Sequence, residues 1–358
     1  MELPELDNLL NRTPVIADIH PLSLLWLVLP TRYVTDGDAF SKMLDDPQKH
    51  TEGRYVIAEY KAGVLKYRFP CVECSHDPFV AELSEFLYGS FDYAIQHIPT
   101  VSNLASQVID AAAEFDIICL VLIDGLSYAQ VKDHGVITCE PYLVDVPTLT
   151  EYAFPAIVRD GIIPRSLVPL GFDLRGFNYW NAERNDLCAK IFAGFSNSQI
   201  RQVASFGEVV ETFASLPSGK HYVQIIRMGL DQYSHHHIDR PNIDALVDDI
   251  LSDLLNLKDV FKHQGRTVAI FGIADHGILW RTDPKLEVME SVTAQGSVHM
   301  RYFEQNEIGR TGRPWGESEQ IWQLDYPLLR RRFRMNEWGC HGGISFEESV
   351  VPLIEIGV

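Results

Sequence analysis

The chain has 358 residues, of which 46% are hydrophobic and 22% are charged, a composition typical of a globular protein with a substantial core. Its formal net charge of −19 argues against broad, non-specific binding to duplex nucleic acid, which depends on neutralising phosphates with Lys and Arg. A short nucleic acid held at a metal site is not excluded by this charge.

Targeting signals are not evident in the sequence. The N-terminus is acidic and lacks the basic region of a signal peptide. The apolar run Pro21–Pro30 is too short to cross a bilayer, which takes about 20 residues. Six scattered cysteines indicate reduced thiols. We therefore expect a cytoplasmic protein with no membrane partner.

The first hundred residues give the weakest pattern, and we expect residues 1–100 to form a small α+β accessory region of unknown role. Tyr55–Tyr60 and Val64–Phe69 are typical of the two strands of a hairpin. Cys71 and Cys74 have the spacing of half a zinc site. No second pair with suitable spacing supplies the other ligands, so two ordinary thiols are the better interpretation.

From residue 101 to 358 the pattern predicts one α/β domain. The expected strands are Phe115–Ile123, Tyr142–Val146, His221–Arg227, Thr267–Ile273 and Val350–Ile356. The expected helices are Val101–Glu114, Thr150–Val158, residues 197–216 and Ile243–Phe261.

The clearest helix, Ile243–Phe261, lies between two expected strands, and strand–helix–strand units are typical of a parallel sheet. Residues 171–220 begin rich in Gly and Asn, which indicates a cap or insertion. The predicted fold class is therefore α/β, with a mostly parallel central sheet flanked by helices and a small N-terminal α+β region.

Carboxylates and histidines follow the apolar strands at several places. They are Asp124, Asp231, His235, Asp275, His276 and His341. Because the loops after parallel strands meet at one edge of the sheet, these side chains are expected to lie together. Mixed histidine and carboxylate donors suit zinc or manganese better than magnesium. Two such ions about 4 Å apart can clamp a displacement at phosphorus.

Each of these residues also has an ordinary explanation when it is taken alone. Three adjacent histidines from His235 occur in plain surface loops, and Asp275 could cap a helix. Thr148 and Thr150 precede an expected helix, where a hydroxyl could face a phosphate. That segment alone favours an N-cap instead. Only the joint pattern favours a metal centre.

The order of these residues resembles that of the alkaline phosphatase superfamily and, more narrowly, that of PglZ domains. The stretches that carry the resemblance are Ile123–Gly125, Pro147–Thr150, Ala274–Gly277 and His341–Leu353, within residues 110–358. The resemblance implies an alkaline phosphatase-like fold. It also implies two metal sites. One would be held by Asp124, Asp275, His276 and Thr150, and the other by Asp231, His235 and His341.

The activity implied by the resemblance is that of a phosphodiesterase with two divalent ions, zinc or alternatively manganese, acting on nucleotide or oligonucleotide phosphoesters. Thr150 fits the family's nucleophile position better than Thr148. Its metal-activated hydroxyl would attack phosphorus, and water would release the resulting phosphothreonine. PglZ domains occur in phage-defence systems and in signalling proteins, so protein partners from such a system are expected.

Two other functions stay open. A phosphomonoesterase of the same fold would need an additional cation, for which Arg175, Arg184 and Arg227 are candidates. A non-catalytic interaction module of a defence complex could dock through residues 1–100 or through the basic run Arg330–Arg334. The simplest interpretation of that run is a solvated helix face. The natural substrate and the oligomeric state also stay open.

Overall fold

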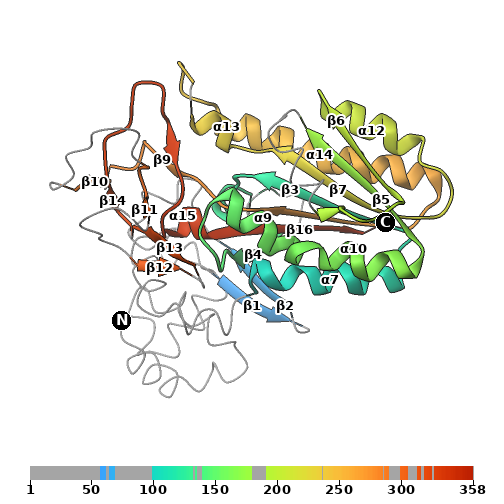
Figure 1. Ribbon diagram of the computed structural model, residues 1–358. Coiled ribbons are helices and arrows are strands. Elements are labelled where there is room, and N and C mark those ends of the chain that lie inside the picture. Colours follow the sequence, from blue (N-terminus) through green and yellow to red (C-terminus); the bar gives the residue numbers. More distant parts are fainter. Residues whose placement is uncertain are drawn as a thin grey trace, which may run out of the picture.

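The computed structural model describes residues 57–61, 64–68, 99–131, 134, 139–179, 191–235, 237–284, 286–289, 299–304, 313–315, 318–324 and 326–357. The described residues form a seven-stranded sheet with helices on both faces and several small sheets at one end (Figure 1). The predicted α/β class with a mostly parallel central sheet is therefore confirmed.

The central sheet contains β4 (Cys139–Leu143), β16 (Val350–Gly357), β8 (Val268–Ala274), β3 (Ile117–Asp124), β7 (Lys220–Met228), β5 (Phe172–Tyr179) and β6 (Ser198–Val203), in this order across the sheet. All neighbours from β8 to β6 are parallel. β16 runs antiparallel to β4 and to β8. The carboxyl ends of six strands and the amino end of β16 consequently share one edge.

The two central strands carry the core. Every residue of β3 and of β8 is buried. Such continuous burial is expected where helices cover both faces of a parallel strand, and it explains why the sequence shows unbroken apolar runs there. In register, Ile123 lies opposite Ala274 and Asp124 lies opposite Met228. The strands therefore end at nearly the same level, which aligns the residues that follow them.

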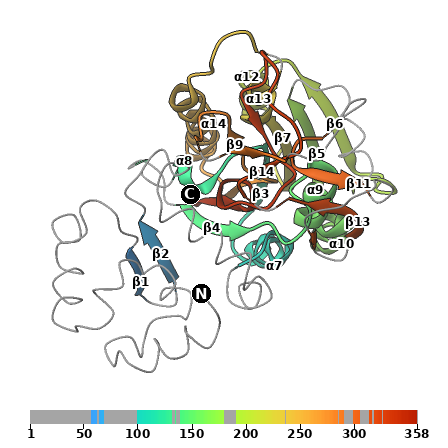
Figure 2. The ribbon, with the colours of Figure 1, turned by 90° about the vertical axis from the view of Figure 1, so that its left-hand side faces the viewer.

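Helices cover the two faces of the sheet. α12 (Phe206–Ala214) and α14 (Ile243–Gln264) pack together on one face, while α7 (Leu104–Asp110), α9 (Thr150–Val158) and α10 (Ile162–Leu167) lie on the other (Figures 1 and 2). The apolar stripe predicted for α14 is buried at Val247, Ile250, Leu251, Leu254 and Leu257. The short 3-10 turns η4 (Val101–Asn103) and η5 (Ala111–Ala113) extend α7 over most of the helix expected at 101–114.

The cap or insertion expected at 171–220 is wrong for the described residues of that range. They form β5, β6 and α12, which belong to the central sheet and its helical layer. The helix expected at 197–216 is correct only in its second half, since β6 takes residues 198–203. β6 is an edge strand with four exposed residues in a row, so it lacks the apolar pattern that identifies a strand.

The additional structure comes instead from the connection between β8 and β16. Its short strands pair as β9 (Leu279–Trp280) with β15 (Gly339–Cys340), and β10 (Glu287–Val288) with β14 (Leu328–Leu329). A three-stranded sheet contains β11 (Tyr302–Glu304), β12 (Arg313–Trp315) and β13 (Ser318–Gln323). These strands lie beyond the carboxyl edge of the central sheet, at the left of Figure 1.

At the N-terminal side, β1 (Ile57–Lys61) and β2 (Val64–Arg68) form the predicted antiparallel hairpin, with β2 next to β4. The other predictions for residues 1–98, including the one on Cys71 and Cys74, lie outside the described residues. Within the described part of the chain, no helix combines the length and apolar character needed to cross a membrane.

Candidate metal centre

The carboxyl edge of the central sheet brings together all seven residues that the sequence analysis named. Asp124 ends β3, and Asp275 and His276 follow β8 directly. Asp231 begins the one-turn helix α13 (Asp231–Ser234) after β7, with His235 just behind it. Thr150 begins α9 beyond β4, and His341 follows β15. The metal-capable atoms form two groups, and within each group they lie within 4.8 Å of one another.

The first group consists of Asp124, Asp275 and His276, and it is buried. The backbone N–H groups of Gly125 and His276 both donate to Asp275 Oδ1 at 3.0 Å. Asp275 Oδ2 lies 3.6 Å from His276 Nε2, and Asp124 Oδ1 lies 3.9 Å from the same nitrogen. Two carboxylates and one imidazole nitrogen therefore converge on a single point.

The hydrogen bond on the far side of the ring sets the tautomer of neutral His276. His276 Nδ1 lies 3.0 Å from the carbonyl oxygen of Gly277, which can only accept, so Nδ1 carries the hydrogen. In the neutral ring, Nε2 then presents its lone pair to the carboxylate oxygens. Acceptors that face one another in this way need a cation or an additional proton between them. A histidine oriented by a backbone carbonyl is a common metal ligand.

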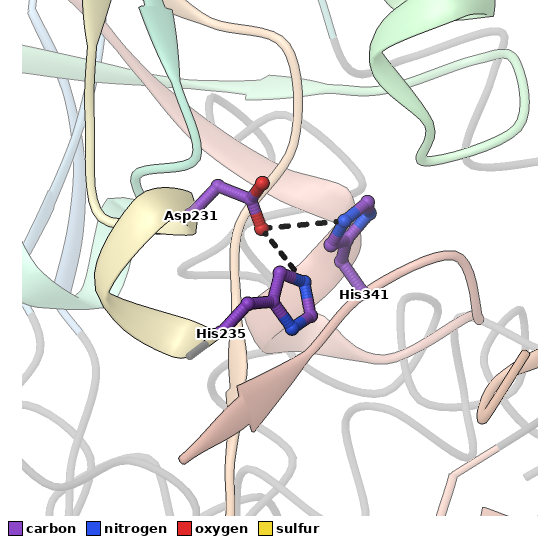
Figure 3. Close-up of side chains that lie close together, drawn as sticks. All are labelled: Asp231, His235 and His341. Carbon is purple, nitrogen blue, oxygen red and sulfur yellow. Dashed lines mark ion pairs between the residues drawn. The ribbon is translucent and has the colours of Figure 1, made fainter. Parts of the chain in front are cut away.

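The second group consists of Asp231, His235 and His341, whose side chains lie close together (Figure 3). This group is partly open to solvent. Asp231 Oδ1 lies 3.3 Å from His235 Nε2 and 3.3 Å from His341 Nε2. His341 Nδ1 donates to the carbonyl oxygen of Thr148 at 3.0 Å, so His341 also directs Nε2 toward a carboxylate. The one-turn helix α13 accounts for the reach of His235 back to Asp231, four residues earlier.

The charges in the second group favour a cation. Burial opposes ionisation of Asp231, but its histidine neighbours, His341 foremost, outweigh burial and hold the pKa of this carboxyl well below its usual range. Burial lowers the pKa of His341, and the neighbouring His276 lowers it further. At neutral pH Asp231 therefore offers an ionised carboxylate and His341 a neutral imidazole, which are the protonation states that bind metals. Burial opposes protonation of His235, but the adjacent Asp231 carboxylate outweighs burial and raises the pKa of His235, so a metal ion would displace a proton there.

The two groups are adjacent. The rings of His276 and His341 stack with their centroids 3.9 Å apart and their planes 7° from parallel. Each ring belongs to a different donor group, so the stacked pair lies at the boundary between the two donor groups. The donor types fit zinc or manganese at both positions.

Thr150 is the threonine that lies at the centre. Its Oγ1 is 3.4 Å from Asp124 Oδ1 and 3.4 Å from His276 Nε2. Thr148, by contrast, is fully buried, and its hydroxyl donates to the carbonyl oxygen of Gly343 at 2.7 Å. The position of the two hydroxyls therefore favours Thr150 over Thr148 as a nucleophile.

The capping interpretation of these threonines is wrong. The N-cap of α9 is Leu149, whose side chain has no polar atom and makes no capping hydrogen bond. The first N–H groups of a helix lack acceptors within the helix and carry a partial positive charge. Beside Thr150, these groups are suited to an anionic phosphoryl group.

Several supporting residues were missed by the sequence analysis. The loop that carries His341 contacts Gln323, Arg301 and Glu348, all of which are fully buried. Glu348 lies in a stretch that carries the family resemblance, but its role gives no local signal. Arg301 and Gln323 lie in short strands and bends without a recognisable motif.

Two of the arginines considered as phosphate-binding cations form ion pairs with acidic residues. Arg175 lies in the middle of β5, level with Val223, and pairs with Asp173. Arg227 binds Asp253 of α14 at 2.7 Å. The third candidate, residue 184, lies outside the described residues.

The helix expected for the basic run Arg330–Arg334 is also wrong, because these residues form bends and irregular backbone after β14. Arg330 is buried over the ring of Phe303, and Arg331 pairs with Glu337 at 2.7 Å. Part of the basic run therefore stabilises the accessory strands instead of facing solvent.

No family model matches the chain, and no curated protein matches it at a significant level. Among solved structures, the fold is similar to that of murine ectonucleotide pyrophosphatase/phosphodiesterase 5, in an inactive form in complex with AMP. The TM-score is 0.45 and the sequence identity is 13%, over 66% of this chain and 87% of that chain. The human counterpart gives a TM-score of 0.44 at 13% identity with the same coverage.

The periplasmic domain of the phosphoethanolamine transferase EptC from Campylobacter jejuni gives a TM-score of 0.33 at 10% identity, over 67% of this chain and 78% of that chain. At these values neither family membership nor activity follows from the similarity.

Proposed function

We propose that this chain is a metal-dependent phosphodiesterase that acts on nucleotide or oligonucleotide phosphoesters through Thr150. One observation carries the proposal: the Thr150 hydroxyl lies 3.4 Å from both Asp124 Oδ1 and His276 Nε2, beside two groups of metal-capable donors. The choice of substrate class rests on the resemblance of the sequence motifs to PglZ domains of the alkaline phosphatase superfamily.

Asp124, Asp275, His276 and Thr150 would hold one divalent ion, and Asp231, His235 and His341 would hold the other. When bound, the two ions would neutralise phosphoryl charge and lower the pKa of a coordinated hydroxyl. The donors are arranged for this task, because His276 and His341 each donate Nδ1–H to a backbone carbonyl and present Nε2 to carboxylates. Zinc is the ion we propose, with manganese as the alternative.

The residues of the chain account for the chemical step as follows. The Thr150 hydroxyl donates to Asp124 Oδ1, which orients the Oγ1 lone pairs. Attack forms a bond between Oγ1 and phosphorus, and the Oγ1 proton is released to solvent. The bond between phosphorus and the leaving oxygen breaks, and that oxygen takes up a proton from water. Hydrolysis of the phosphothreonine by water restores the threonine. Phosphoryl transfer depends mainly on positioning and charge neutralisation, which this site offers.

A phosphomonoesterase is the second candidate, and the two candidate cations that the structure describes give it no support. Monoesters carry an extra phosphoryl charge, and enzymes that specialise in them supply a further cation. Arg175 pairs with Asp173, and Arg227 pairs with Asp253. Partners from a defence or signalling system also remain a proposal. The intact donor set argues against a purely structural module, because a non-catalytic site is free to lose ligands.

The test is hydrolysis of a chromogenic phosphodiester and its monoester counterpart in the presence of zinc or manganese. We expect diester turnover by the wild type, at least a hundredfold loss in Thr150→Ala, and partial retention in Thr150→Ser. Thr212→Ala, on α12 and outside the site, is the matched control and should keep wild-type turnover. Preferred turnover of the monoester, or full activity in Thr150→Ala, would contradict the proposal.

A further inference from the structure

The polar contacts of Thr148 set it apart from ordinary core residues. Thr148 is fully buried, and its hydroxyl donates to Gly343 O at 2.7 Å while accepting from Gln323 Nε2 at 2.9 Å. Its carbonyl oxygen accepts from His341 Nδ1 at 3.0 Å. Side chain and backbone of one residue therefore both bind the loop that carries His341.

Gln323 completes this contact from the opposite side. Its Nε2 donates to Gly342 O at 2.9 Å and reaches Gly343 O at 3.2 Å, in addition to Thr148 Oγ1. Carbonyl oxygens can only accept, so the amide nitrogen of Gln323 must be the atom that faces them. The fully buried side chain thus fixes two consecutive peptide groups directly after His341.

A buried ion pair holds the next part of the loop. Gly343 N donates to Glu348 Oε1 at 2.8 Å, and Arg301 Nη2 donates to Glu348 Oε2 at 2.8 Å and to Ile344 O at 3.3 Å. Arg301 and Glu348 have no exposed surface. Together, Thr148, Gln323, Arg301 and Glu348 form what we call the loop anchor.

The glycines of the loop fit the loop anchor closely. Gly342 has φ +100°, a region that L side chains rarely adopt, and a Cβ there would meet the Tyr302 ring at 2.6 Å. A Cβ on Gly343 would lie 2.4 Å from Arg301 Nε. The backbone after His341 must therefore approach the buried polar groups directly, and only glycine allows this distance.

From these contacts we infer that Thr148 and Gln323 are positioning residues, which hold His341 as a ligand in register with the segment that carries Thr150. The inference rests on the proposed two-metal function. Thr150 faces the first donor group. Thr148 lies two residues earlier, and the polar atoms of Thr148 bind the loop that carries His341 of the second group. Loss of the Thr148 hydroxyl should weaken the group of Asp231, His235 and His341 selectively.

The experiment compares Thr148→Val, which removes the hydroxyl at nearly constant volume, with Thr148→Ser, which keeps it. Gln323→Met removes the amide at similar size and serves as a second variant. Thr212→Val on α12 is the control, because within the described part of the chain the Thr212 hydroxyl binds Glu208 and Arg201, outside the site. Zinc binding is measured by equilibrium dialysis with elemental analysis. Hydrogen exchange of residues 341–344 is followed by mass spectrometry in the metal-free chain.

We expect Thr148→Val and Gln323→Met to keep one zinc ion at wild-type affinity and to bind the other at least about tenfold more weakly, as is usual for loss of a partner that orients a metal ligand. Exchange at residues 341–344 should accelerate in both variants. Thr148→Ser should restore both properties, and Thr212→Val should leave both unchanged.

Two results would overturn the inference. One is wild-type affinity for both ions together with unchanged exchange at residues 341–344. The other is equal weakening of both ions in step with global destabilisation, which would show that the loop anchor contributes only to folding. A wild-type chain that binds no zinc would overturn the proposed function instead, and the exchange data would still report whether Thr148 and Gln323 hold the loop.

Discussion

Gly277 offers a sharp test of the packing behind the candidate metal centre. Its N–H donates to Glu348 O at 2.9 Å, and its carbonyl oxygen accepts from His276 Nδ1 at 3.0 Å. A Cβ at this position would lie 1.7 Å from Glu347 O and 2.4 Å from Ser127 Oγ. The methyl group of Gly277→Ala would therefore displace both the Glu347 carbonyl oxygen and the Ser127 hydroxyl.

The magnitude follows from the displacement that the methyl group requires. An ordinary contact begins near 3.4 Å, so Glu347 O must retreat by about 1.7 Å. Overpacking of a dense interior costs about 1–3 kcal/mol. Ser127 Oγ also donates to Glu347 O at 2.6 Å, and losing a buried hydrogen bond adds about 1 kcal/mol. We expect Gly277→Ala to lower the free energy of unfolding by about 3 kcal/mol.

The assay is urea unfolding of the metal-free chain followed by circular dichroism, with unchanged slope as the check on two-state behaviour. Gly207→Ala is the matched control. Gly207 lies in α12, where a Cβ meets only Ser205 Oγ at 3.6 Å, so alanine should raise the free energy of unfolding by about 0.5–1 kcal/mol. A Gly277→Ala variant within about 0.5 kcal/mol of the wild type would show that the interior accepts the methyl group without the expected displacement.

Three further predictions concern the carboxylates of the same region. Glu348→Gln removes the buried negative charge that pairs with Arg301 and should lower the free energy of unfolding in urea by about 3–5 kcal/mol. A smaller loss in Glu348→Gln than in the double variant Glu348→Gln/Arg301→Met would contradict this. Burial, followed by nearby acids, raises the pKa of Glu347 from 4.5 to about 7. The folded chain then binds the proton more tightly, so stability falls as the pH rises from about 4.5 to 7, by up to about 3 kcal/mol, and Glu347→Gln should remove this slope. An identical pH slope in Glu347→Gln would exclude Glu347 as its source. Asp275→Asn should keep its hydrogen bonds from Gly125 and His276 but lose one zinc ion by elemental analysis, whereas retention of two ions would contradict the assignment of the first donor group.

The sequence predicts the centre of the fold well because local chemistry decides it. β3 and β8 are buried along their whole length, so their residues must be apolar without interruption. α14 buries one stripe of a long amphipathic helix, and its period is visible in one dimension. Strands of this kind also indicate where their carboxyl ends lie, which is why the positions of Asp124 and Asp275 could be anticipated.

Other parts of the fold depend on contacts that leave little local pattern. β6 lies at the edge of the sheet and exposes four residues in a row. The strands between β8 and β16 are two to six residues long, too short to display a period. The Gly- and Asn-rich start of the segment at 171–220 therefore suggested a cap, although its apolar residues Phe172 and Leu174 pack in the core.

The candidate site also combines features that a local sequence pattern reveals with features that it does not. The residue types that bind metals could be named from the sequence, but the roles of Thr148 and Thr150 could not be separated by spacing alone. The deciding contact joins Thr148 to Gln323, 175 residues later in the chain. Arg301 reaches Glu348 across 47 residues. These contacts join residues that are far apart in the sequence, so no short motif could predict them.

The most direct test of the two-metal centre is the zinc content of the unmodified chain. The protein would be saturated with zinc, freed of loosely bound metal by gel filtration, and analysed for metal and protein concentration. Two donor groups around His276 and His341 predict two ions per chain. A content of one ion or fewer per chain would contradict a two-metal centre.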